Sequence, residues 1–330
     1  SWKRNRLFHR VMCLALFEEC VVQQRATVVK AIRRPKTKRK PVPLCTIAMV
    51  KTLSRSRRMP AKKIQDTAEK LYSKGILSYP RTETEVFRPD FDLRALIAQQ
   101  AQSPQWGGFA QRLIAGDFEQ PRAGPSDDNA HPPIHPLKFV PPASLENQDE
   151  RNVYEFVVRH FLACCSQDAC GSGVDLEVAI GHERFTTNGL AIEEKNYLDV
   201  YIYDKWTNKS VPDLREGDVF VPSRLEMKQQ RTRPPPYLSE ADLISLMEKH
   251  GIGTDATMGQ HIEKIKEREY VAEFTTGNNQ QPRLRCQKLG SAIIKVSVVA
   301  SLLLPPPFPP SWGSSPSSPF SLSLSFPFLF

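Results

Sequence analysis

The spacing of apolar residues predicts an amphipathic helix in the first third of the chain. Within residues 60–74, Ile64, Ala68, Leu71 and Tyr72 fall at i, i+4, i+7 and i+8, and Pro60 suits the first helical position. Gly75 then supplies a helix stop, and the chain is expected to run extended from there to residue 79. Similar helical patterns cover residues 93–115 and 153–165, whereas the Pro-rich residues 121–143 are expected to be irregular.

A second helical region is predicted near the end of the chain. Ser239 is expected to be an N-cap, because Asp242 occupies the third helical position as in a capping box. This helix should end near His250-Gly251, and another should cover residues 256–269. The glycine-containing segment 251–255 is therefore predicted to be a tight joint between two helices.

Strand patterns occupy two regions. Near the start, Val11–Phe17 and Thr27–Ile32 are predicted strands, and the basic residues 33–43 are predicted to form a turn. Between residues 174 and 227, β-branched and aromatic residues alternate with polar ones in four short runs, at 174–180, 184–187, 197–203 and 218–227. A strand-rich segment that follows a helical one indicates a separate domain.

The last forty or so residues have a different composition. No charged residue follows Lys295, and residues 305–330 consist mainly of Pro, Ser, Phe and Leu. Neither a helical period nor a strand pattern is sustained there. Residues 291–330 are therefore expected to be a low-complexity tail unrelated to the fold, with a Pro-rich ligand for a partner as the alternative.

Charge changes this picture at the other end of the chain. The formal net charge is +9, and the excess of Lys and Arg is concentrated in residues 1–63. A basic block ahead of a mildly acidic body favours a polyanionic partner such as nucleic acid, with a solvated basic face as the alternative.

The seven cysteines exclude some classes of site. They form no C-x-x-C pair, so a zinc ribbon is not supported, and their irregular spacing favours reduced thiols inside the cell. The apolar run at residues 11–17 is too short to span a bilayer, and no signal-peptide pattern is present. The expected compartment is the cytosol or the nucleus, without membrane attachment.

The segment Tyr79-Pro80-Arg81 carries the first candidate chemistry. The residue before a proline is extended, so residues i and i+2 should project to the same side. A guanidinium beside a phenol could hold a phosphate and stabilise the charge that develops in phosphoryl transfer. For an isolated Y-P-R, a surface Tyr and Arg flanking a turn would be the more frequent explanation.

The longer segments around this triplet resemble a known family. They are L-S-Y-P-R-T-E-T at 77–84, W-K-R-N-R-L-F at 2–8, W-G-G-F-A-Q at 106–111, A-H-P-P-I-H-P at 130–136, R-H-F-L-A-C-C-S-Q-D at 159–168, N-Y-L-D-V-Y at 196–201 and S-E-A-D-L-I-S-L-M-E-K-H-G-I-G-T-D-A-T at 239–257. Their order and spacing resemble the type IA DNA topoisomerases, in particular the topoisomerase III kind of animals. The resemblance covers residues 1 to about 290.

The resemblance implies roles for individual residues. Tyr79 would be the nucleophile that forms a 5′-phosphotyrosine bond, Arg81 would stabilise the scissile phosphate, and His131 would contact the phosphate backbone. A single-strand DNA groove would be lined by Lys249, Gly251, Gly253 and Thr254. Without the resemblance, His131 would be an ordinary surface residue, and the glycine segment would be an ordinary helix–helix turn. His135 has no assigned role.

The fold implied by the resemblance is mixed α/β and multidomain, a partial type IA toroid. Its parts would be the start of a β-rich arch domain (1–55), a helical, winged-helix-like domain that carries the active-site Tyr (56–165), the arch continued (166–230), part of a helical single-strand-groove domain (231–290) and the tail (291–330).

The activity implied is that of a type I isomerase, which cuts one DNA strand, passes another strand through the gap and reseals it without ATP. Mg²⁺ would be required, and the family implies a RecQ-type helicase and an OB-fold protein as partners in recombination and repair in the nucleus. The family's metal carboxylates belong to an acidic Toprim domain, yet only Glu18 and Glu19 are acidic within residues 1–60. The chain is therefore expected to be incomplete and inactive alone.

Two other functions remain open at this stage. The chain could bind single-stranded DNA without cutting it, through basic and aromatic surfaces. A tyrosine recombinase also combines Tyr with Arg, but it needs further Arg and His residues in another order.

Overall fold

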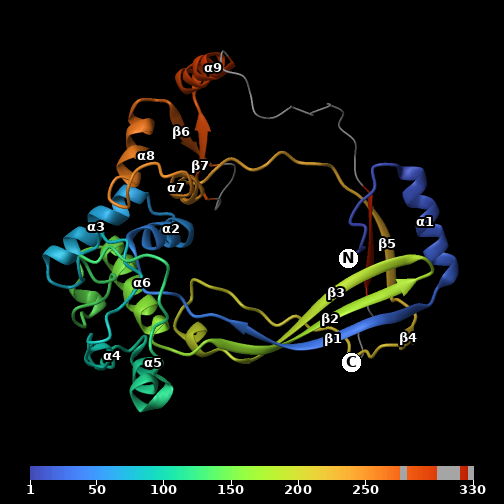
Figure 1. Cartoon of the computed structure of the whole chain (residues 1–330), viewed down its shortest axis with the longest axis horizontal. Helices are drawn as coiled ribbons and strands as arrows, with labels where there is room; N and C mark the ends of the chain where they lie inside the picture. The colour runs from blue at the N-terminus through green and yellow to red at the C-terminus, as the bar shows by residue number, and fades with distance from the viewer. Residues whose placement is uncertain (276–280, 303–319, 326–330) are drawn as a thin grey trace.

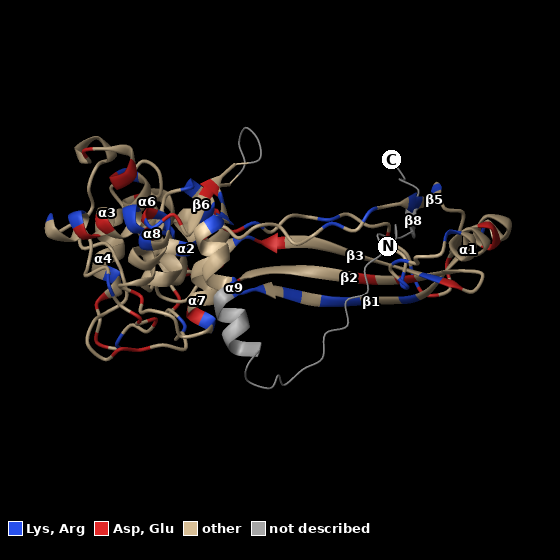
Figure 2. Cartoon of the chain, turned by 90° about the horizontal axis from the view of Figure 1, so that it is seen from above, with Lys and Arg blue, Asp and Glu red and all other residues tan. Residues whose placement is uncertain are grey.

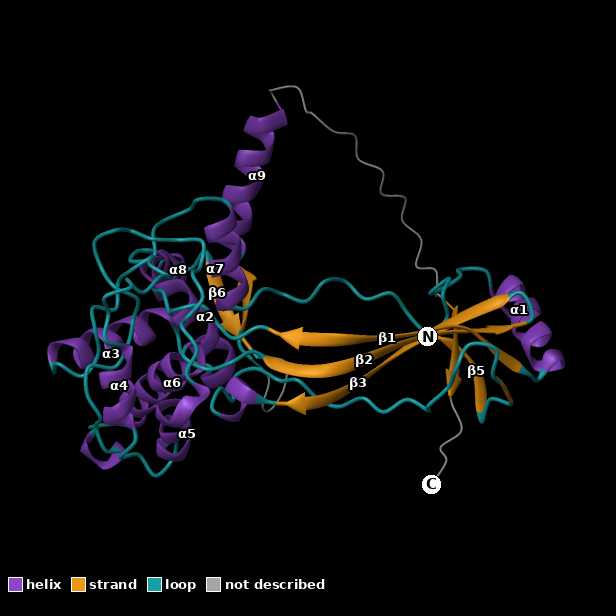
Figure 3. Ribbon diagram, turned by 60° about the horizontal axis from the view of Figure 1, so that its bottom comes forward, coloured by secondary structure: helices purple, strands orange, loops and turns teal. Residues whose placement is uncertain are grey.

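A helical body and a long antiparallel sheet lie at opposite ends of the molecule's longest axis (Figure 1). The structure is a computed structural model and describes residues 1–275, 281–302 and 320–325. The mixed α/β class expected from the sequence is confirmed, with most helices gathered in one body and the long strands of the main sheet outside it (Figure 3).

The main sheet has four strands in the order β3-β2-β1-β4. β1 (Ala26–Lys38) lies between β2 (Ala169–Ile180) and β4 (Val219–Phe220), and β3 (Glu183–Glu194) pairs with the other edge of β2. The pairing of β1 with β2 runs from Thr27 opposite Ala179 to Lys38 opposite Ala169. The predicted basic turn at 33–43 is thus wrong for its first half, because residues 33–38 continue the strand.

One helix covers the far end of this sheet. α1 (Arg10–Gln23) buries Cys13 and Cys20 in a small core with sheet residues, whereas Val11 and Val22 are each 79% exposed. The prediction of a strand at 11–17 is therefore wrong. Its apolar run lacks the alternation of a strand, and residues seven positions apart share one helix face.

The helical body is built around α6 (Gln148–Cys164), whose apolar side chains lie in the large core. α2 (Thr46–Arg57) and α3 (Ala61–Ser73) pack against it, and α3 buries the predicted stripe of Ile64, Ala68 and Leu71. The remaining elements of this part are α4 (Leu93–Gln100), α5 (Gly107–Arg112), the π-helical η1 (Leu113–Asp117) and the 3-10 helix η2 (Pro142–Ser144). Most of α2 lies within the segment 1–55 that was assigned to the arch, yet its buried residues belong to the core of the helical body.

The predicted strand at 197–203 is wrong. Residues 196–199 form the 3-10 helix η3 (Asn196–Asp199), and Tyr197, Val200 and Tyr201 are buried in the core of the helical body. Aromatic and β-branched residues gave this segment a strand pattern, but their side chains fill the space beside α6 rather than one face of a sheet.

The chain crosses between the two ends once more after the sheet. β5 (Arg224–Gln229) lies near the sheet, and an extended segment then leads to α7 (Glu240–Lys249) and α8 (Met258–Glu267) in the helical body (Figure 1). β6 (Val271–Phe274) and β7 (Arg283–Cys286) form a hairpin, and α9 (Lys288–Leu302) follows. The capping box at Ser239 and Asp242 is confirmed.

Part of the predicted tail has regular structure. Residues 291–302 belong to α9, and β8 (Phe320–Ser325) pairs antiparallel with β5, so the expectation of no strand in this region is wrong at 320–325. Residues 303–319 and 326–330 of the predicted tail lie outside the described residues. Within the described ranges, no helix combines the length and the apolar character that a bilayer span needs.

Basic side chains follow β1 along the sheet (Figure 2). Several of them are paired within the molecule: Arg33 with Asp213, Arg34 with Asp175, and Lys38 with Asp204 at 2.5 Å. The basic block predicted from composition therefore forms part of an elongated, partly neutralised surface.

Candidate active site

A helix end places Tyr79. The amide of Gly75 donates to the carbonyl of Tyr72 (2.8 Å), and that of Ile76 donates to the carbonyl of Leu71 (3.0 Å), which closes α3 with a Schellman motif. Gly75 has a φ of +63°, a conformation that glycine adopts without strain. The chain leaves α3 at this point as the Tyr79 loop, residues 76–84.

The Tyr79 loop is tied to the loop that contains His131. Leu77 pairs antiparallel with Pro136, and the amide of Ser78 donates to the carbonyl of His135 (3.0 Å). The Ser78 hydroxyl accepts the amide of His135 in return (2.9 Å). This short pairing brings two segments about fifty residues apart into one site.

The ring of Tyr79 is half-buried between two other rings. It contacts Tyr72 edge to face at a centroid distance of 5.4 Å, and it lies 4.7 Å from the His131 ring at 35°. The structure therefore brings Tyr79 and His131 together, as the family resemblance implied. It also adds Tyr72, which the sequence interpretation treated only as part of an apolar stripe and which is 45% exposed.

Arg81 is held by a carboxylate of α3, the helix that precedes the Tyr79 loop. Its Nε donates to Oε1 of Glu69 at 2.6 Å, and its Nη2 contacts the same oxygen. Glu69 and Tyr72 are three residues apart on α3, so one helix face meets both Arg81 and Tyr79. The two side chains thus reach one surface, and Glu69 balances the guanidinium charge next to the phenol.

Asp128 anchors His131. Its carboxylate accepts the amides of Ala130 and His131 (both 2.8 Å) and the Thr82 hydroxyl (3.1 Å), and it lies 3.5 Å from Nδ1 of His131. Burial opposes ionisation of this carboxyl, but the hydrogen bonds from His131, Ala130, Thr84 and Thr82 outweigh that effect and hold its pKa well below its usual range. Asp128 was not singled out from the sequence.

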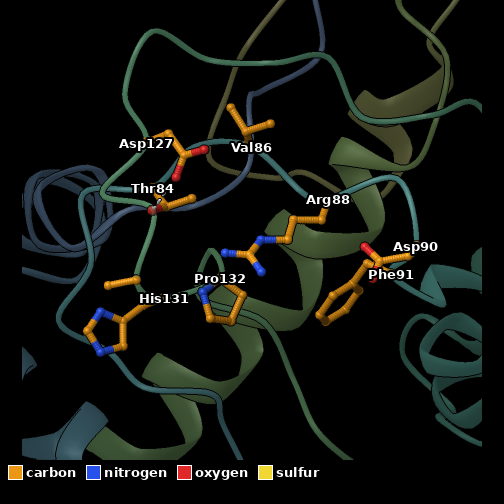
Figure 4. A pocket seen from close by; sticks show the side chains of 9 residues that line it. Thr84, Val86, Arg88, Asp90, Phe91, Asp127, His131 and Pro132 are labelled. Atoms are coloured by element: carbon orange, nitrogen blue, oxygen red, sulfur yellow. Dashed lines mark hydrogen bonds between the residues drawn. The ribbon is translucent and has the colours of Figure 1, made fainter.

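A cavity of about 260 Å³ lies on one side of His131 (Figure 4). Its wall includes Arg88, whose Nη2 donates to the carbonyl of Asn129 (3.2 Å) and whose guanidinium lies beside Pro132. His135, by contrast, is buried, and its Nδ1 lies 2.7 Å from the Pro133 carbonyl. Burial lowers the pKa of His135, so this ring supports the loop as a neutral group.

The predicted groove residues lie at the end of α7 and in the turn that leads to α8. Lys249 and Thr254 are exposed, and Gly251 (φ +63°) closes α7 with the same Schellman geometry seen at Gly75. Gly253 has a φ of +78°, and a Cβ there would lie 3.0 Å from the His261 ring. The helix–helix turn alone is thus enough to explain a glycine at position 251, as in the alternative interpretation of this segment.

The same face of α3 also meets this glycine loop (residues 251–255). Nε2 of Gln65 donates to the carbonyl of Asp255 at 2.9 Å. Gln65, Glu69 and Tyr72 stand at i, i+4 and i+7, and they contact the glycine loop, Arg81 and Tyr79 respectively. These three residues form a polar stripe beside the buried apolar stripe of α3, and this stripe is the sequence pattern that could have identified them as parts of the site.

The residues of this site do not form a metal centre. Across residues 1–275, 281–302 and 320–325, no group of three or more His, Cys, Asp or Glu side chains is arranged to hold a metal ion. The carboxylates of Glu69 and Asp128 are engaged by Arg81 and by the His131 loop. The residues of this site therefore do not fit Mg²⁺.

Comparison with known proteins places this geometry in context. The family model described as DNA topoisomerase matches residues 1–302. DNA topoisomerase 3-alpha of Homo sapiens is 51% identical over 271 residues, which are 82% of this chain and 27% of the human protein. DNA topoisomerase 3 of Schizosaccharomyces pombe is 43% identical over 296 residues, 89% of this chain and 48% of that protein. The chain therefore spans about a quarter to a half of these relatives.

A solved structure supports the fold. Full-length topoisomerase I from Thermotoga maritima superposes with a TM-score of 0.68 over 82% of this chain and 44% of that chain, at 19% sequence identity.

Proposed function

Because the chain belongs to the type IA DNA topoisomerase family, we propose that it carries the strand-cutting tyrosine of such an enzyme, with Tyr79 as the nucleophile. The observation that supports this most directly is the meeting of the Tyr79 and His131 rings, whose centroids lie 4.7 Å apart, with Arg81 hydrogen-bonded to Glu69 on the α3 face that also meets Tyr79. A phenol, a guanidinium and an imidazole at one surface suit covalent transfer of a phosphodiester.

The proposed step exchanges one phosphate ester for another. The Tyr79 oxygen attacks the phosphorus of a single DNA strand and loses its proton, and the 3′-oxygen of the upstream nucleotide leaves and gains a proton. The products are a 5′-phosphotyrosine and a free 3′-hydroxyl. The bond energy is retained in the new ester, so the reverse reaction reseals the strand without ATP after another strand has passed.

Arg81 and His131 have distinct proposed roles. A phosphate that enters the site competes with Glu69 for Arg81, and the guanidinium then stabilises the negative charge of the transition state. His131, which Asp128 fixes by its backbone, contacts a neighbouring phosphate. Lys249, Gly251, Gly253 and Thr254 would hold the backbone of the same strand.

The wider setting is proposed on family membership alone. We propose that Mg²⁺ is held by carboxylates of a Toprim domain in a longer protein, and that this chain does not cleave DNA without them. A RecQ-type helicase and an OB-fold protein would be partners, in recombination and repair in the nucleus. The similarity to topoisomerase 3-alpha and topoisomerase 3 proteins supports these proposals.

A trapping assay tests the nucleophile. The chain is mixed with a 3′-labelled single-stranded oligonucleotide and Mg²⁺, with or without a separately expressed Toprim domain, and stopped with detergent. Labelled protein is expected only with the added domain. Tyr79→Phe is expected to abolish it while oligonucleotide affinity changes less than about twofold, because only the phenolic oxygen is lost.

The other outcomes have defined meanings. An equal yield of adduct from Tyr79→Phe would show that another residue is the nucleophile. Adduct without the Toprim domain would contradict the proposed dependence on external carboxylates. Oligonucleotide binding without adduct in either mixture would favour a non-catalytic single-strand-binding function.

A further inference from the structure

Thr46 forms hydrogen bonds with both the Tyr79 loop and the glycine loop. It is the first residue of α2, is fully buried and lies far from both of these loops in sequence. Its amide donates to the carbonyl of Thr82 (3.0 Å), and its hydroxyl oxygen accepts the amide of Thr82 (2.9 Å). This reciprocal pair of hydrogen bonds fixes the backbone next to Arg81.

The Thr46 hydroxyl also faces three competing acceptors. Two belong to the Tyr79 loop, the carbonyl oxygens of Pro80 at 2.8 Å and Thr82 at 3.1 Å, and the third is Oδ2 of Asp255 in the glycine loop at 3.3 Å. A hydroxyl has one proton to donate. The Tyr79 loop and the glycine loop therefore depend on the same proton, and a shift of either loop changes the hydrogen bond that remains for the other.

We infer that Thr46 and Asp255 are a positioning pair, which holds the backbone between Tyr79 and Arg81 and couples it to the single-strand groove. The inference rests on the proposed function for its catalytic part only. Displacement of the Asp255 carboxylate by a bound strand leaves the hydroxyl proton to the carbonyls of Pro80 and Thr82, which tightens the loop beside the nucleophile. Neither residue touches the reacting atoms.

The chain offers matched variants. Thr46→Val keeps the shape and removes the hydroxyl, whereas Thr46→Ser keeps it. Asp255→Ala removes the carboxylate, whereas Asp255→Asn keeps an acceptor oxygen. Thr67→Val is the control, because Thr67 is also buried but its hydroxyl donates to the Lys63 carbonyl within its own helix.

The first test measures amide hydrogen exchange of the peptide that contains residues 79–84, in the full chain without DNA. Thr46→Val is expected to raise its exchange rate by about tenfold, because the loop loses its hydroxyl partner, whereas Asp255→Ala is expected to lower the rate, because the hydroxyl proton is then left to the Tyr79 loop. Thr46→Ser, Asp255→Asn and Thr67→Val should stay near wild type. An unchanged rate in Asp255→Ala would overturn the coupling, and an equal rise in Thr67→Val would show that the effect is general destabilisation.

The second test uses the trapping assay with the Toprim domain and oligo(dT). Thr46→Val is expected to lower the rate of adduct formation at saturating oligonucleotide by about tenfold or more, with Kd changed less than about twofold, since small displacements of a nucleophile are costly. Thr46→Ser should restore the rate. A fall in affinity with an unchanged rate would overturn the positioning role. If wild type forms no adduct, the proposed function fails, while hydrogen exchange still decides the coupling.

Discussion

Asp128 is one of the side chains whose hydrogen bonds hold the loops of the site in place. Its carboxylate gathers backbone and hydroxyl donors from both sides of the pairing between the Tyr79 loop and the His131 loop. A charged acceptor of several hydrogen bonds is stronger than a neutral one. The position of His131 beside Tyr79 therefore depends on a residue that takes no proposed part in the chemistry.

This role predicts a pH-dependent loss of stability in Asp128→Asn. The variant is expected to be less stable than wild type at pH 7 by about 1–3 kcal/mol, because an amide cannot accept all of these bonds. The pKa of Asp128 is lowered in the folded state, so its contribution is full above the unfolded pKa of about 3.9 and is lost as the pH falls towards the folded value.

Urea unfolding between pH 3 and pH 8 measures this difference. The gap between wild type and Asp128→Asn should be constant above about pH 5 and should shrink below about pH 4. Asp117→Asn, at an exposed position at the end of η1, is the control and should show no such gap. A gap that widens as the pH falls would contradict the assignment.

Residue types that carry chemistry could be predicted, but their partners could not. Tyr79, Arg81 and His131 stand in recognisable motifs, and the structure brings Tyr79 and His131 together. Thr46 acts through hydrogen bonds to residues up to 209 positions away, which no local pattern encodes. Glu69 and Asp128 also contact residues nearer in sequence, and Glu69 stands in the polar stripe of α3. The predicted roles in DNA binding remain predictions.

At the scale of elements, α3 explains how the site is held. Its buried stripe fixes the helix in the core, and its polar stripe meets the glycine loop, Arg81 and Tyr79. The helix then stops at Gly75, so that the next residues turn back along its own side. Any change at this stop should alter both stability and the direction of the Tyr79 loop.

Gly75→Ala tests the stop. The glycine has a φ of +63° with open space around its Cβ position, so the expected cost is backbone strain of about 1–2 kcal/mol rather than a clash. Urea unfolding should show this loss, and Gly75→Asn should lose less. Gly108→Ala, in α5 and also with open space, should be neutral or stabilising. Equal effects at positions 75 and 108 would refute the strain.

Elements were predictable where one face is buried and the period is regular. The helices starting near residues 60, 153 and 239 and the strands near 174 and 184 follow this rule. The failures at 11–17 and 197–203 have a common cause. Both are short apolar runs whose burial is decided by the surface they happen to meet, the end of the sheet for α1 and the side of α6 for η3.

At the scale of the whole molecule, charge is distributed over two ends that a long sheet separates (Figure 2). The net charge is +9, so binding of an oligonucleotide should weaken steeply as salt rises. We expect the loss of a positive charge to affect oligonucleotide binding differently at the two ends, because only the helical end contains the proposed groove.

Lys249→Gln should reduce the slope of log affinity against log salt by about 0.7, the loss of one single-strand phosphate contact. Lys3→Gln removes the same charge at the sheet end, where Lys3 is paired with Glu177 at 2.8 Å, and should leave the slope nearly unchanged. Fluorescence anisotropy of a labelled oligo(dT) between about 50 and 300 mM salt, over which the Debye length changes about 2.4-fold, measures both slopes. Equal slopes for the two variants would place the strand elsewhere.

The separation of Thr46 from Asp255 by 209 residues also has a consequence during synthesis of the protein on the ribosome. At a translation rate of about 5–20 residues per second, Asp255 is made about 10–40 s after Thr46. Throughout that interval the nascent Tyr79 loop lacks the contact that joins it to the glycine loop, and α3 lacks its partner in α8. The order of synthesis therefore keeps the tyrosine out of its final setting until most of the chain has left the ribosome.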